Sequence, residues 1–294
     1  MSFEAQYIKY KQLFSGELSK MDKIILDAVS PREELKTPLL NFLNSPSKRI
    51  RPVLAMLYLK ALEFEISEDI VKLLSAVEII HNASLVHDDI IDESEFRRGD
   101  KTLSQRFGNK LGVIAGDYLL SLAMGIISNL GDVEILREFS ATLKQMCLGE
   151  INQNFDLFKI GTIENYIEKS QNKTAYLFKS AIVSPLILSK KSEEIIERAS
   201  DFALNFGVAF QIRDDLINIT KSDHSKPYGN DIAEGIYNAP VIYAGGVENL
   251  PVGIEKTRIL LNNYIEKALL SLEKLPNNDY KTLLINLTEL TKDV

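Results

Sequence analysis

The stretch His81–Gly99 reads HNASLVHDDIIDESEFRRG, and it gathers opposite charges within a few residues. Apolar and small residues come first, four acids follow within residues 88–94, and two adjacent arginines come soon after. Residues four apart share one face of a helix, about 6 Å apart along its axis, so Asp88 and Asp92 are expected to be neighbours. Two carboxylates at a helix C-terminus also oppose the negative end of the helix dipole. The pattern therefore predicts that a cation compensates this pair.

Helical spacing dominates the chain on both sides of this stretch. Apolar residues recur at intervals of three and four in segments 52–64, 69–92, 193–219 and 257–275, and strand alternation with hairpin turns is absent. Glycines and prolines divide the pattern into about ten helices. The sequence thus predicts an all-α fold, a single large helical bundle. Because no linker-like break appears, residues 1–294 are expected to form one domain.

Composition limits the function and the compartment. The formal net charge of −7 argues against a nucleic-acid-binding surface. One cysteine, Cys147, excludes an internal disulfide, favours a cytoplasmic location and is expected to be a small packed side chain. The first residues lack the apolar core of a secretory signal. Segment Leu111–Gly131 is long enough to span a membrane, but it contains Asp117, so a helix buried in a soluble core is favoured over a transmembrane segment.

A second acidic cluster repeats the spacing of the first. Asp214, Asp215 and Asn218 stand near the end of another predicted helix. Magnesium prefers oxygen ligands and commonly binds through one or two carboxylates together with substrate phosphates. Two such clusters that face each other across a bundle would hold several Mg²⁺ ions with a polyphosphate between them.

Cations and a histidine accompany the acids. His81 precedes Asp88 by seven residues and so lies on the same stripe, two turns deeper, either as an interior histidine or as a ligand contact. Lysine and arginine bind phosphate oxygens by charge-assisted hydrogen bonds. The candidates are Lys48, Arg49, Arg51, Arg97, Arg98, Lys173 and Lys226.

In this order, the motifs resemble those of the trans-isoprenyl diphosphate synthases, also called polyprenyl synthetases. The resemblance runs from about Lys48 to Ala244 and rests on KRIRP, EIIHNASLVHDDIIDESEFRRG, AGDYLLSLA, GEINQ, KTAYLF, FQIRDDLIN and KPYGNDI with PVIYA. It implies an all-α bundle around a deep central cavity. It also implies Mg²⁺-dependent, head-to-tail 1′-4 condensation of isopentenyl diphosphate with an allylic diphosphate.

The resemblance assigns roles to individual residues. The catalytic residues would be Asp88, Asp92, Lys173 and Asp214. The metal ligands, for three Mg²⁺ with substrate bound, would be Asp88, Asp92, Asp214 and Asp215. The allylic diphosphate would contact Arg97, Lys173, Thr174, Gln211 and Lys226. The isopentenyl diphosphate would contact Lys48, Arg51, His81 and Arg98.

Three positions depart from the family's pattern. Pro46–Ser47 replaces the glycine pair that usually precedes Lys-Arg, and Asn218, a neutral oxygen ligand, replaces the last acid of the second motif. Residues 235–238 read GIYN, so Ile236 stands where the late Gly-Lys-x-Thr pattern has a lysine. Because the first motif is intact, we expect an active enzyme and leave a reduced rate open.

Product length is expected to depend on residues below the first motif. Ser84 lies one turn beneath Asp88, about 6 Å down, and Ala83 beside it is also small. By resemblance, small residues here imply a product longer than geranylgeranyl, from hexaprenyl to octaprenyl. Leu120, Met124 and Ile127 are candidates for the cavity floor, with ordinary core packing as the alternative. A farnesyl or geranylgeranyl diphosphate synthase is the other reading.

The motifs also bear on the assembly of the protein and on two alternative functions. The resemblance implies a homodimer, with the catalytic chain of a heterodimer as the alternative, and product release at a membrane surface stays open. A terpene cyclase shares the first motif, but segment NDIAEGIYN (230–238) lacks the hydroxyl and the last acid that its second motif needs. A non-catalytic partner subunit usually loses its acids, whereas this chain keeps both clusters.

Overall fold

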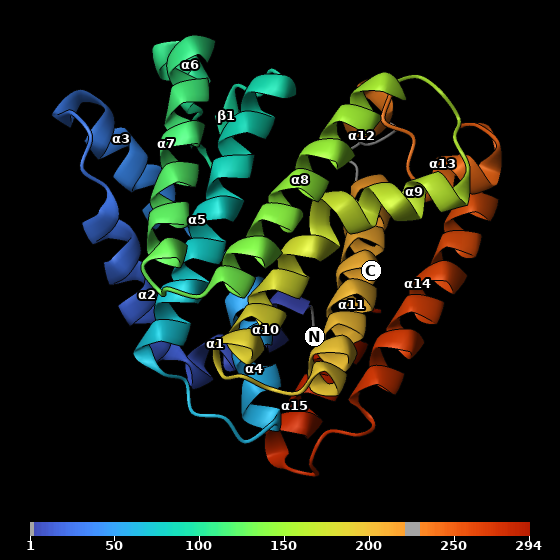
Figure 1. Cartoon of the computed structure of the whole chain (residues 1–294). Helices are drawn as coiled ribbons and strands as arrows, with labels where there is room; N and C mark the ends of the chain where they lie inside the picture. Colours follow the sequence, from blue (N-terminus) through green and yellow to red (C-terminus); the bar gives the residue numbers. More distant parts are fainter. Residues whose placement is uncertain (1–2, 221–229) are drawn as a thin grey trace.

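The structure is a computed structural model that describes residues 3–220 and 230–294. Its helices are α1 (Phe3–Leu13), α2 (Ser15–Ala28), α3 (Glu33–Asn44), α4 (Ile50–Ala61), α5 (Glu68–Ile91), α6 (Leu103–Phe107), α7 (Asn109–Ser128), α8 (Val133–Phe155), α9 (Ile163–Ser170), α10 (Tyr176–Leu188), α11 (Glu193–Thr220), α12 (Asn230–Ala233), α13 (Ala239–Ala244), α14 (Leu250–Leu272) and α15 (Asp279–Leu290). A π-helical segment, η1 (Gln171–Ala175), joins α9 to α10, and β1 (Phe96–Arg97) pairs with β2 (Asp100–Lys101) in a short hairpin. The all-α prediction is confirmed (Figure 1).

The number of helices is larger than predicted. The described residues form fifteen α-helices and not about ten. Helices α6, α12 and α13 have only 5, 4 and 6 residues, too few to show a repeating apolar face. The four segments with clear helical spacing all lie largely in helices, in α4, α5, α11 and α14.

Helix α10 is the centre of the bundle. It contacts α4, α5, α8 and α11, and nine of its thirteen residues are buried. Its sequence, YLFKSAIVSPLIL, is apolar on nearly every side, which is the composition of a helix surrounded by other helices. The two long helices that carry the acidic motifs, α5 and α11, therefore pack on the same central helix (Figure 1).

Helices α5 and α7 pack closely because glycine lies at their contact. A Cβ atom at Gly116 would lie 2.2 Å from Nε2 of His87, so a larger residue would fit there only if the His87 ring moved. At its start, α5 is capped by Ser67, whose side chain accepts a hydrogen bond from the backbone N–H of Ile70. The helix then runs without interruption to Ile91, and this places the first acidic motif at its C-terminal end.

The expectation for Leu111–Gly131 is partly wrong. Two helices in the described chain, α5 and α7, are long and apolar enough to span a membrane by length and composition, which is weak evidence of a span. The apolar window is 72% buried in α5 but only 33% buried in α7. Leu119, Ala123 and Ile127 form the buried stripe of α7, whereas Val113 and Ile114 are exposed. Most of α7 is therefore not a core helix within the single chain.

Candidate active site

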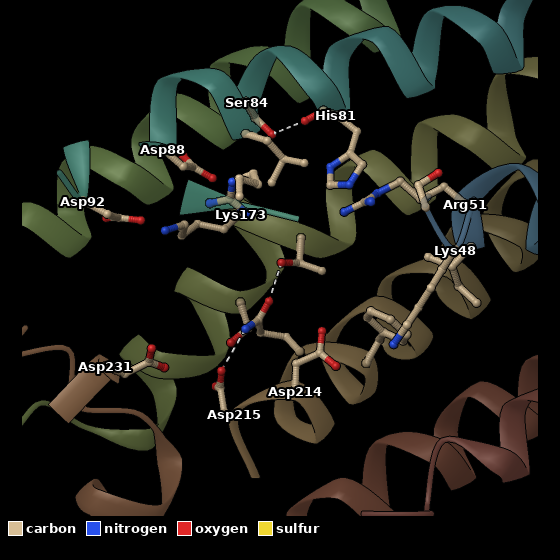
Figure 2. A pocket seen from close by; sticks show the side chains of 18 of the residues that line it. Lys48, Arg51, His81, Ser84, Asp88, Asp92, Lys173, Asp214, Asp215 and Asp231 are labelled. Carbon is tan, nitrogen blue, oxygen red and sulfur yellow. Dashed lines mark hydrogen bonds between the residues drawn. The ribbon is translucent and has the colours of Figure 1, made fainter. Parts of the chain in front are cut away.

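A cavity of about 680 Å³ brings the two acidic motifs together. Figure 2 shows Asp88, in the last turn of α5, and Asp92, just after its end, along one wall, and Asp214 and Asp215 of α11 on the opposite wall. The predicted site residues that line the cavity are Lys48, Arg51, His81, Ser84, Asp88, Asp92, Arg97, Arg98, Lys173, Thr174, Gln211, Asp214 and Asp215. Of the remaining two, Lys226 lies outside the described residues. Ala83 is fully buried and is not among the lining residues, so only Ser84 of the predicted pair faces the cavity.

The three aspartates of the first motif have different surroundings: two face the cavity and one forms a buried ion pair. The backbone N–H of Asp92 donates to the carbonyl of Asp88 at 2.8 Å, so the two carboxylates stay on one face. Asp89 is buried on another face and pairs with Nε of Arg97. Burial raises the pKa of Asp88 to about 6, while the nearby Lys173 opposes the shift. Asp88 and Asp92 thus remain open to the cavity, and Asp89 orients Arg97.

The two aspartates of the second motif also differ in their surroundings, and the sequence did not predict this difference. Both carboxylate oxygens of Asp215 accept hydrogen bonds, one from the Tyr166 hydroxyl at 2.6 Å and one from Nε2 of Gln211 at 2.8 Å. Burial raises the pKa of Asp215 to about 7. Asp214 faces the cavity and contacts Nη1 of Arg213 at 3.3 Å. Asp214 is therefore the accessible acid of this wall, and metal binding by Asp215 stays a prediction.

The π-helical segment presents Lys173 and Thr174 to the cavity. Thr174 donates to Oε1 of Gln211 at 2.6 Å, and Lys173 forms an ion pair with Glu150 of α8 at 2.6 Å. A Cβ atom at Gly149 would lie 2.9 Å from the side chains of Asn172 and Lys173, so glycine permits α8 to approach this segment. Wide turns of this kind are common at functional sites.

Cationic side chains gather at the end of the cavity that is lined by Lys48, Arg51 and Arg98. Arg51 is 9% exposed and its guanidinium lies 4.8 Å from the centre of the Phe178 ring. Its Nε atom is buried without a hydrogen-bond partner among the described residues. Burial holds the pKa of His81 well below its usual value, and Arg51 and Arg98 add to the shift. A neutral histidine among arginines is suited to donate a hydrogen bond to a phosphate oxygen.

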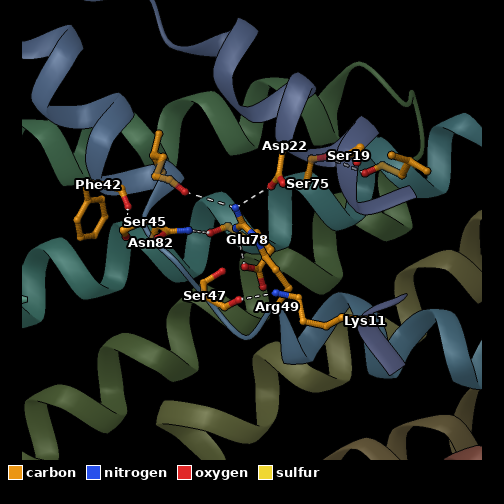
Figure 3. A network of polar contacts seen from close by, with 12 residues as sticks. Lys11, Ser19, Asp22, Phe42, Ser45, Ser47, Arg49, Ser75, Glu78 and Asn82 are labelled. Carbon is orange, nitrogen blue, oxygen red and sulfur yellow. Dashed lines mark hydrogen bonds and ion pairs between the residues drawn. The ribbon is translucent and has the colours of Figure 1, made fainter. Parts of the chain in front are cut away.

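A partly buried ion-pair network fixes the loop that carries Lys48 and leads into Arg51 at the start of α4. Arg49 adopts a left-handed conformation, with φ 52°, at the start of α4. Its guanidinium pairs with Glu78 of α5 at 2.9 Å and with Asp22 of α2 at 2.8 Å (Figure 3). Side chains that hold a non-glycine residue in this conformation must outweigh its strain. Arg49 is thus a positioning residue, and its network orders the loop although Pro46–Ser47 replaces the glycine pair.

Glu78→Gln is expected to destabilise the protein by about 3–5 kcal/mol, because it removes one partner of a buried ion pair. It should also raise the KM for isopentenyl diphosphate, since the loop that bears Lys48 and Arg51 loses its anchor. Urea denaturation and initial rates at varied substrate concentrations measure the two effects.

Asp22→Asn is the matched control for this prediction. The Asp22 side chain is 48% exposed, against 2% for Glu78, so its loss should change stability by less than about 1 kcal/mol. Equal losses in the two variants would contradict the anchoring role of the buried pair.

The structure adds site residues that the sequence analysis missed. Asp231 lines the cavity and accepts hydrogen bonds from Nδ2 of Asn218 at 3.0 Å and from Nδ2 of Asn238 at 2.7 Å. Lys169, which lines the cavity, and Glu150, which pairs with Lys173 and lines the neighbouring apolar cleft, are two more. Asp231 and Glu150 stand inside the motifs KPYGNDI and GEINQ, so those motifs contained the signal. Lys169 had no such signal.

The donor atoms of the cavity fit a hard divalent cation. Asp88, Asp92, Asp214 and Asp231 offer only carboxylate oxygens, which Mg²⁺ prefers. Oδ1 of Asn218 is buried with no hydrogen-bond partner among the described residues, while its amide nitrogen serves Asp231. Within residues 3–220 and 230–294, no three acids, histidines or cysteines form one compact metal-binding group.

The raised pKa of Asp88 predicts a pH-dependent difference in stability. A carboxyl whose pKa is higher in the folded than in the unfolded protein stabilises the fold when protonated, and this contribution is lost as the pH rises. Relative to Asp88→Asn, the metal-free wild-type protein should therefore lose stability as the pH rises through about 6. Thermal unfolding of both proteins in a chelator, across this range, measures the difference.

Comparison with the variant isolates Asp88 from His81, whose lowered pKa acts with the opposite sign in the same pH range. Added Mg²⁺ and pyrophosphate should reverse the trend of the wild type, because they bind the ionised carboxylate. A difference that does not vary with pH would contradict the assigned pKa shift.

An apolar cleft leads away from the cavity. It has a volume of about 370 Å³, shares Ser84, Asp88 and Lys173 with the cavity, and runs between α5, α7 and α8. Of the predicted floor residues, Leu120 lines it, Met124 is partly buried against the hydrophobic core, and Ile127 lies within that core. Cys147 is exposed on the cleft wall, so the expectation that it is a packed core side chain is wrong.

The fold and the site together define a class of enzyme. An all-α bundle encloses a cavity with acids on two walls and cations around them, and an apolar cleft continues from the first acid. Such a site is suited to a substrate with a diphosphate head and a hydrocarbon tail.

Comparison with known proteins identifies the family. A sequence model of the polyprenyl synthetase family matches residues 32–268. The chain belongs to this family and is a prenyltransferase, as its motifs predicted. It is 35% identical to the decaprenyl-diphosphate synthase of Dictyostelium discoideum, over 95% of this chain and 70% of that one. It is 28% identical to heptaprenyl diphosphate synthase component 2 of Geobacillus stearothermophilus, over 98% and 97% of the two chains.

A solved structure agrees with this assignment. The heptaprenyl diphosphate synthase of Staphylococcus aureus superposes with a TM-score of 0.88 at 26% identity, over 96% of this chain and 98% of that chain. The chain spans about half the length of two plant solanesyl diphosphate synthases that it also matches.

Proposed function

We propose that this protein condenses isopentenyl diphosphate head to tail with an allylic diphosphate and makes an all-trans polyprenyl diphosphate longer than C20. The observation that carries the proposal is the cavity itself. Two acid-bearing walls face each other, cations line both ends, and the apolar cleft begins at Ser84 and Asp88. The polar part suits two diphosphates and the cleft suits a growing hydrocarbon chain.

The acids and cations of the cavity would bind magnesium and the allylic diphosphate. Asp88, Asp92 and Asp214 would hold magnesium, three ions with substrate bound, and this metal would neutralise the charge that develops on the leaving pyrophosphate. Lys173 and Arg97 would contact the allylic diphosphate and stabilise it as the C–O bond breaks.

The second substrate would bind at the positive end of the cavity. Lys48, Arg51, His81 and Arg98 would hold isopentenyl diphosphate so that its double bond attacks the allylic carbocation. A new carbon–carbon bond then forms, and the loss of one proton restores a double bond. The apolar walls would keep water from the cation, because water would convert it to an alcohol.

The size of the product is the finer part of the proposal. Ser84 leaves the entrance of the cleft open, since its side chain is small and bends back to the His81 carbonyl at 2.8 Å. The relatives are named for decaprenyl, solanesyl and heptaprenyl products. We therefore favour a product of hexaprenyl size or longer.

Assembly and location also belong to the proposal. The exposed apolar face of α7 suits contact with a second copy of the chain. The name component 2 of one relative also keeps a second kind of subunit open. One domain over residues 1–294 and a cytoplasmic location are proposed as well, although two plant relatives are named as chloroplastic.

The test is incubation of the purified chain alone with labelled isopentenyl diphosphate, Mg²⁺ and one allylic primer at a time. Labelled polyprenyl products that depend on both substrates and on Mg²⁺ support the proposal, and their chromatography after dephosphorylation gives the length. If the folded chain forms no product alone but does so with a second subunit, the homodimer proposal is wrong. Cyclic hydrocarbon products would indicate a terpene cyclase.

A further inference from the structure

Lys169 belongs to none of the predicted motifs, and it lies at one corner of the cavity. It is in the last turn of α9, and it lines both the main cavity and a smaller pocket of about 240 Å³ next to it. Its Nζ donates a hydrogen bond to Oδ1 of Asn238 at 3.1 Å. The ammonium group also lies 5.7 Å from the centre of the Tyr166 ring.

The hydrogen bond to Asp231 fixes the orientation of the Asn238 side-chain amide. Asp231 accepts from the amide groups of both Asn218 and Asn238, one on each carboxylate oxygen. An asparagine side chain has one amide NH₂ and one carbonyl oxygen. The NH₂ group of Asn238 donates to Asp231, so Oδ1 of Asn238 points away from Asp231. In this orientation Oδ1 accepts the hydrogen bond from Lys169. The ammonium group is thus held by a neutral oxygen.

The positive charge of Lys169 has no ion-pair partner among the described residues. Lys173 on the same wall differs, because it pairs with Glu150 at 2.6 Å. An ammonium group has three N–H donors, and the described residues occupy one of them. Burial lowers the pKa of Lys169, whereas Asp215 raises it. Asp231 and Glu150 also raise it, but none of these carboxylates forms an ion pair with Lys169, so an anionic ligand in direct contact with the ammonium group would offset the cost of its burial.

The same corner contains the position where the family's late motif has lysine. Ile236 lines both pockets together with Lys169, and Asn238 lines the main cavity. The apolar side chain of Ile236 supplies no charge there. Among the described residues, Lys169 of α9 is the lysine that lines both pockets, and the late motif contributes none.

We propose that Lys169 binds the diphosphate of the allylic substrate and supplies the cation that position 236 lacks. The inference deepens the proposed function and rests on it. Its chemistry is one charge-assisted hydrogen bond from an ammonium group to a phosphate oxygen. It also predicts that the lysine can be moved between the two positions without loss of function.

Lys169→Met keeps the length of the side chain and removes its charge. The KM for the allylic diphosphate should rise about ten- to one-hundred-fold, as for the loss of one hydrogen bond to a charged group. The KM for isopentenyl diphosphate should stay unchanged, because that substrate binds at the other end of the cavity. The double variant Lys169→Met with Ile236→Lys should recover most of the lost affinity.

Lys159→Met is the matched control. Lys159 lines only the smaller pocket and donates to the carbonyl of Phe155, so its loss should leave both KM values unchanged. Unchanged allylic KM in Lys169→Met would overturn the inference. So would an equal rise in both KM values, or a double variant no better than the single one.

Calorimetric binding of inorganic pyrophosphate with Mg²⁺ separates this inference from the proposed function. Weaker binding to Lys169→Met than to the wild type, at equal thermal stability, supports the lysine even if no prenyl product forms. Equal binding to both overturns it even if the wild type is fully active.

Discussion

Asp88→Asn is expected to lower the rate of condensation by a factor of about 100 to 1000, the size found when one preorganised electrostatic contact is lost. The substitution keeps the shape of the side chain and removes the negative charge. Asp88 is the only residue of the first motif that lines both the cavity and the apolar cleft. It therefore stands where the diphosphate head of the substrate meets its hydrocarbon tail.

Initial rates with labelled isopentenyl diphosphate, at increasing Mg²⁺ concentrations, measure this effect. The variant should also need more Mg²⁺ for half of its maximal rate, because it has lost a charged ligand. Its metal-free form should be no less stable than the wild type near neutral pH, since burial raises the pKa of Asp88 to about 6 and disfavours its charged form.

Glu93→Gln is the control for charge alone. Glu93 belongs to the same cluster, is exposed and does not line the cavity, so its loss should leave the rate and the Mg²⁺ requirement unchanged. Asp88→Asn at the wild-type rate would exclude the proposed metal role. Similar losses in both variants would show that net charge matters and not the position of Asp88.

Ser84→Phe is expected to shorten the product strongly. Ser84 lines both the cavity and the cleft, and it precedes Asp88 by one turn of α5. A phenyl ring at this point would fill the entrance of the cleft and stop the growing chain after fewer additions. The rate of the first condensation should change little, because the residues that contact the diphosphates are untouched. Chromatography of the dephosphorylated products measures chain length.

Ala83→Phe separates the effect of the cleft from the effect of the fold. Ala83 is fully buried and lines neither the cavity nor the cleft, so a larger side chain must displace its packed neighbours. We expect a loss of about 1–3 kcal/mol in the free energy of unfolding, and products of wild-type length from the folded fraction. A shorter product from Ala83→Phe, or an unchanged product from Ser84→Phe, would contradict this assignment of the chain-length residue.

The sequence predicted which residues line the site better than it predicted what each one does. Thirteen of the fifteen predicted site residues line one cavity, and their roles stay predictions. Their partners were not predicted. Arg97 lies beyond the end of α5 and Tyr166 comes from α9, whereas Gln211 stands one turn before Asp215 in α11, a spacing that could have shown its contact. Asp89 was one of three similar aspartates until its contact with Arg97 set it apart, and Asp215 differs from Asp214 through its bonds to Tyr166 and Gln211.

By itself, the sequence determined the all-α class, the extent of α5 and α11 and the placement of both acidic motifs near helix ends. These features depend on the spacing of side chains along one segment, and helical periodicity is local. The pattern of motifs also determined the family. A strict reading of spacing could even separate Ser84 from Ala83, since only Ser84 lies one turn below Asp88.

Only the tertiary structure decided which charges are open to substrate. It showed that Arg49 anchors a loop, that much of α7 is exposed and that Lys169 enters the corner beside Ile236. The physical reason is that burial, ion pairing and the direction of an amide depend on atoms from several helices at once. No spacing within one helix contains that information, so chemically identical side chains acquire different roles only when the bundle is complete.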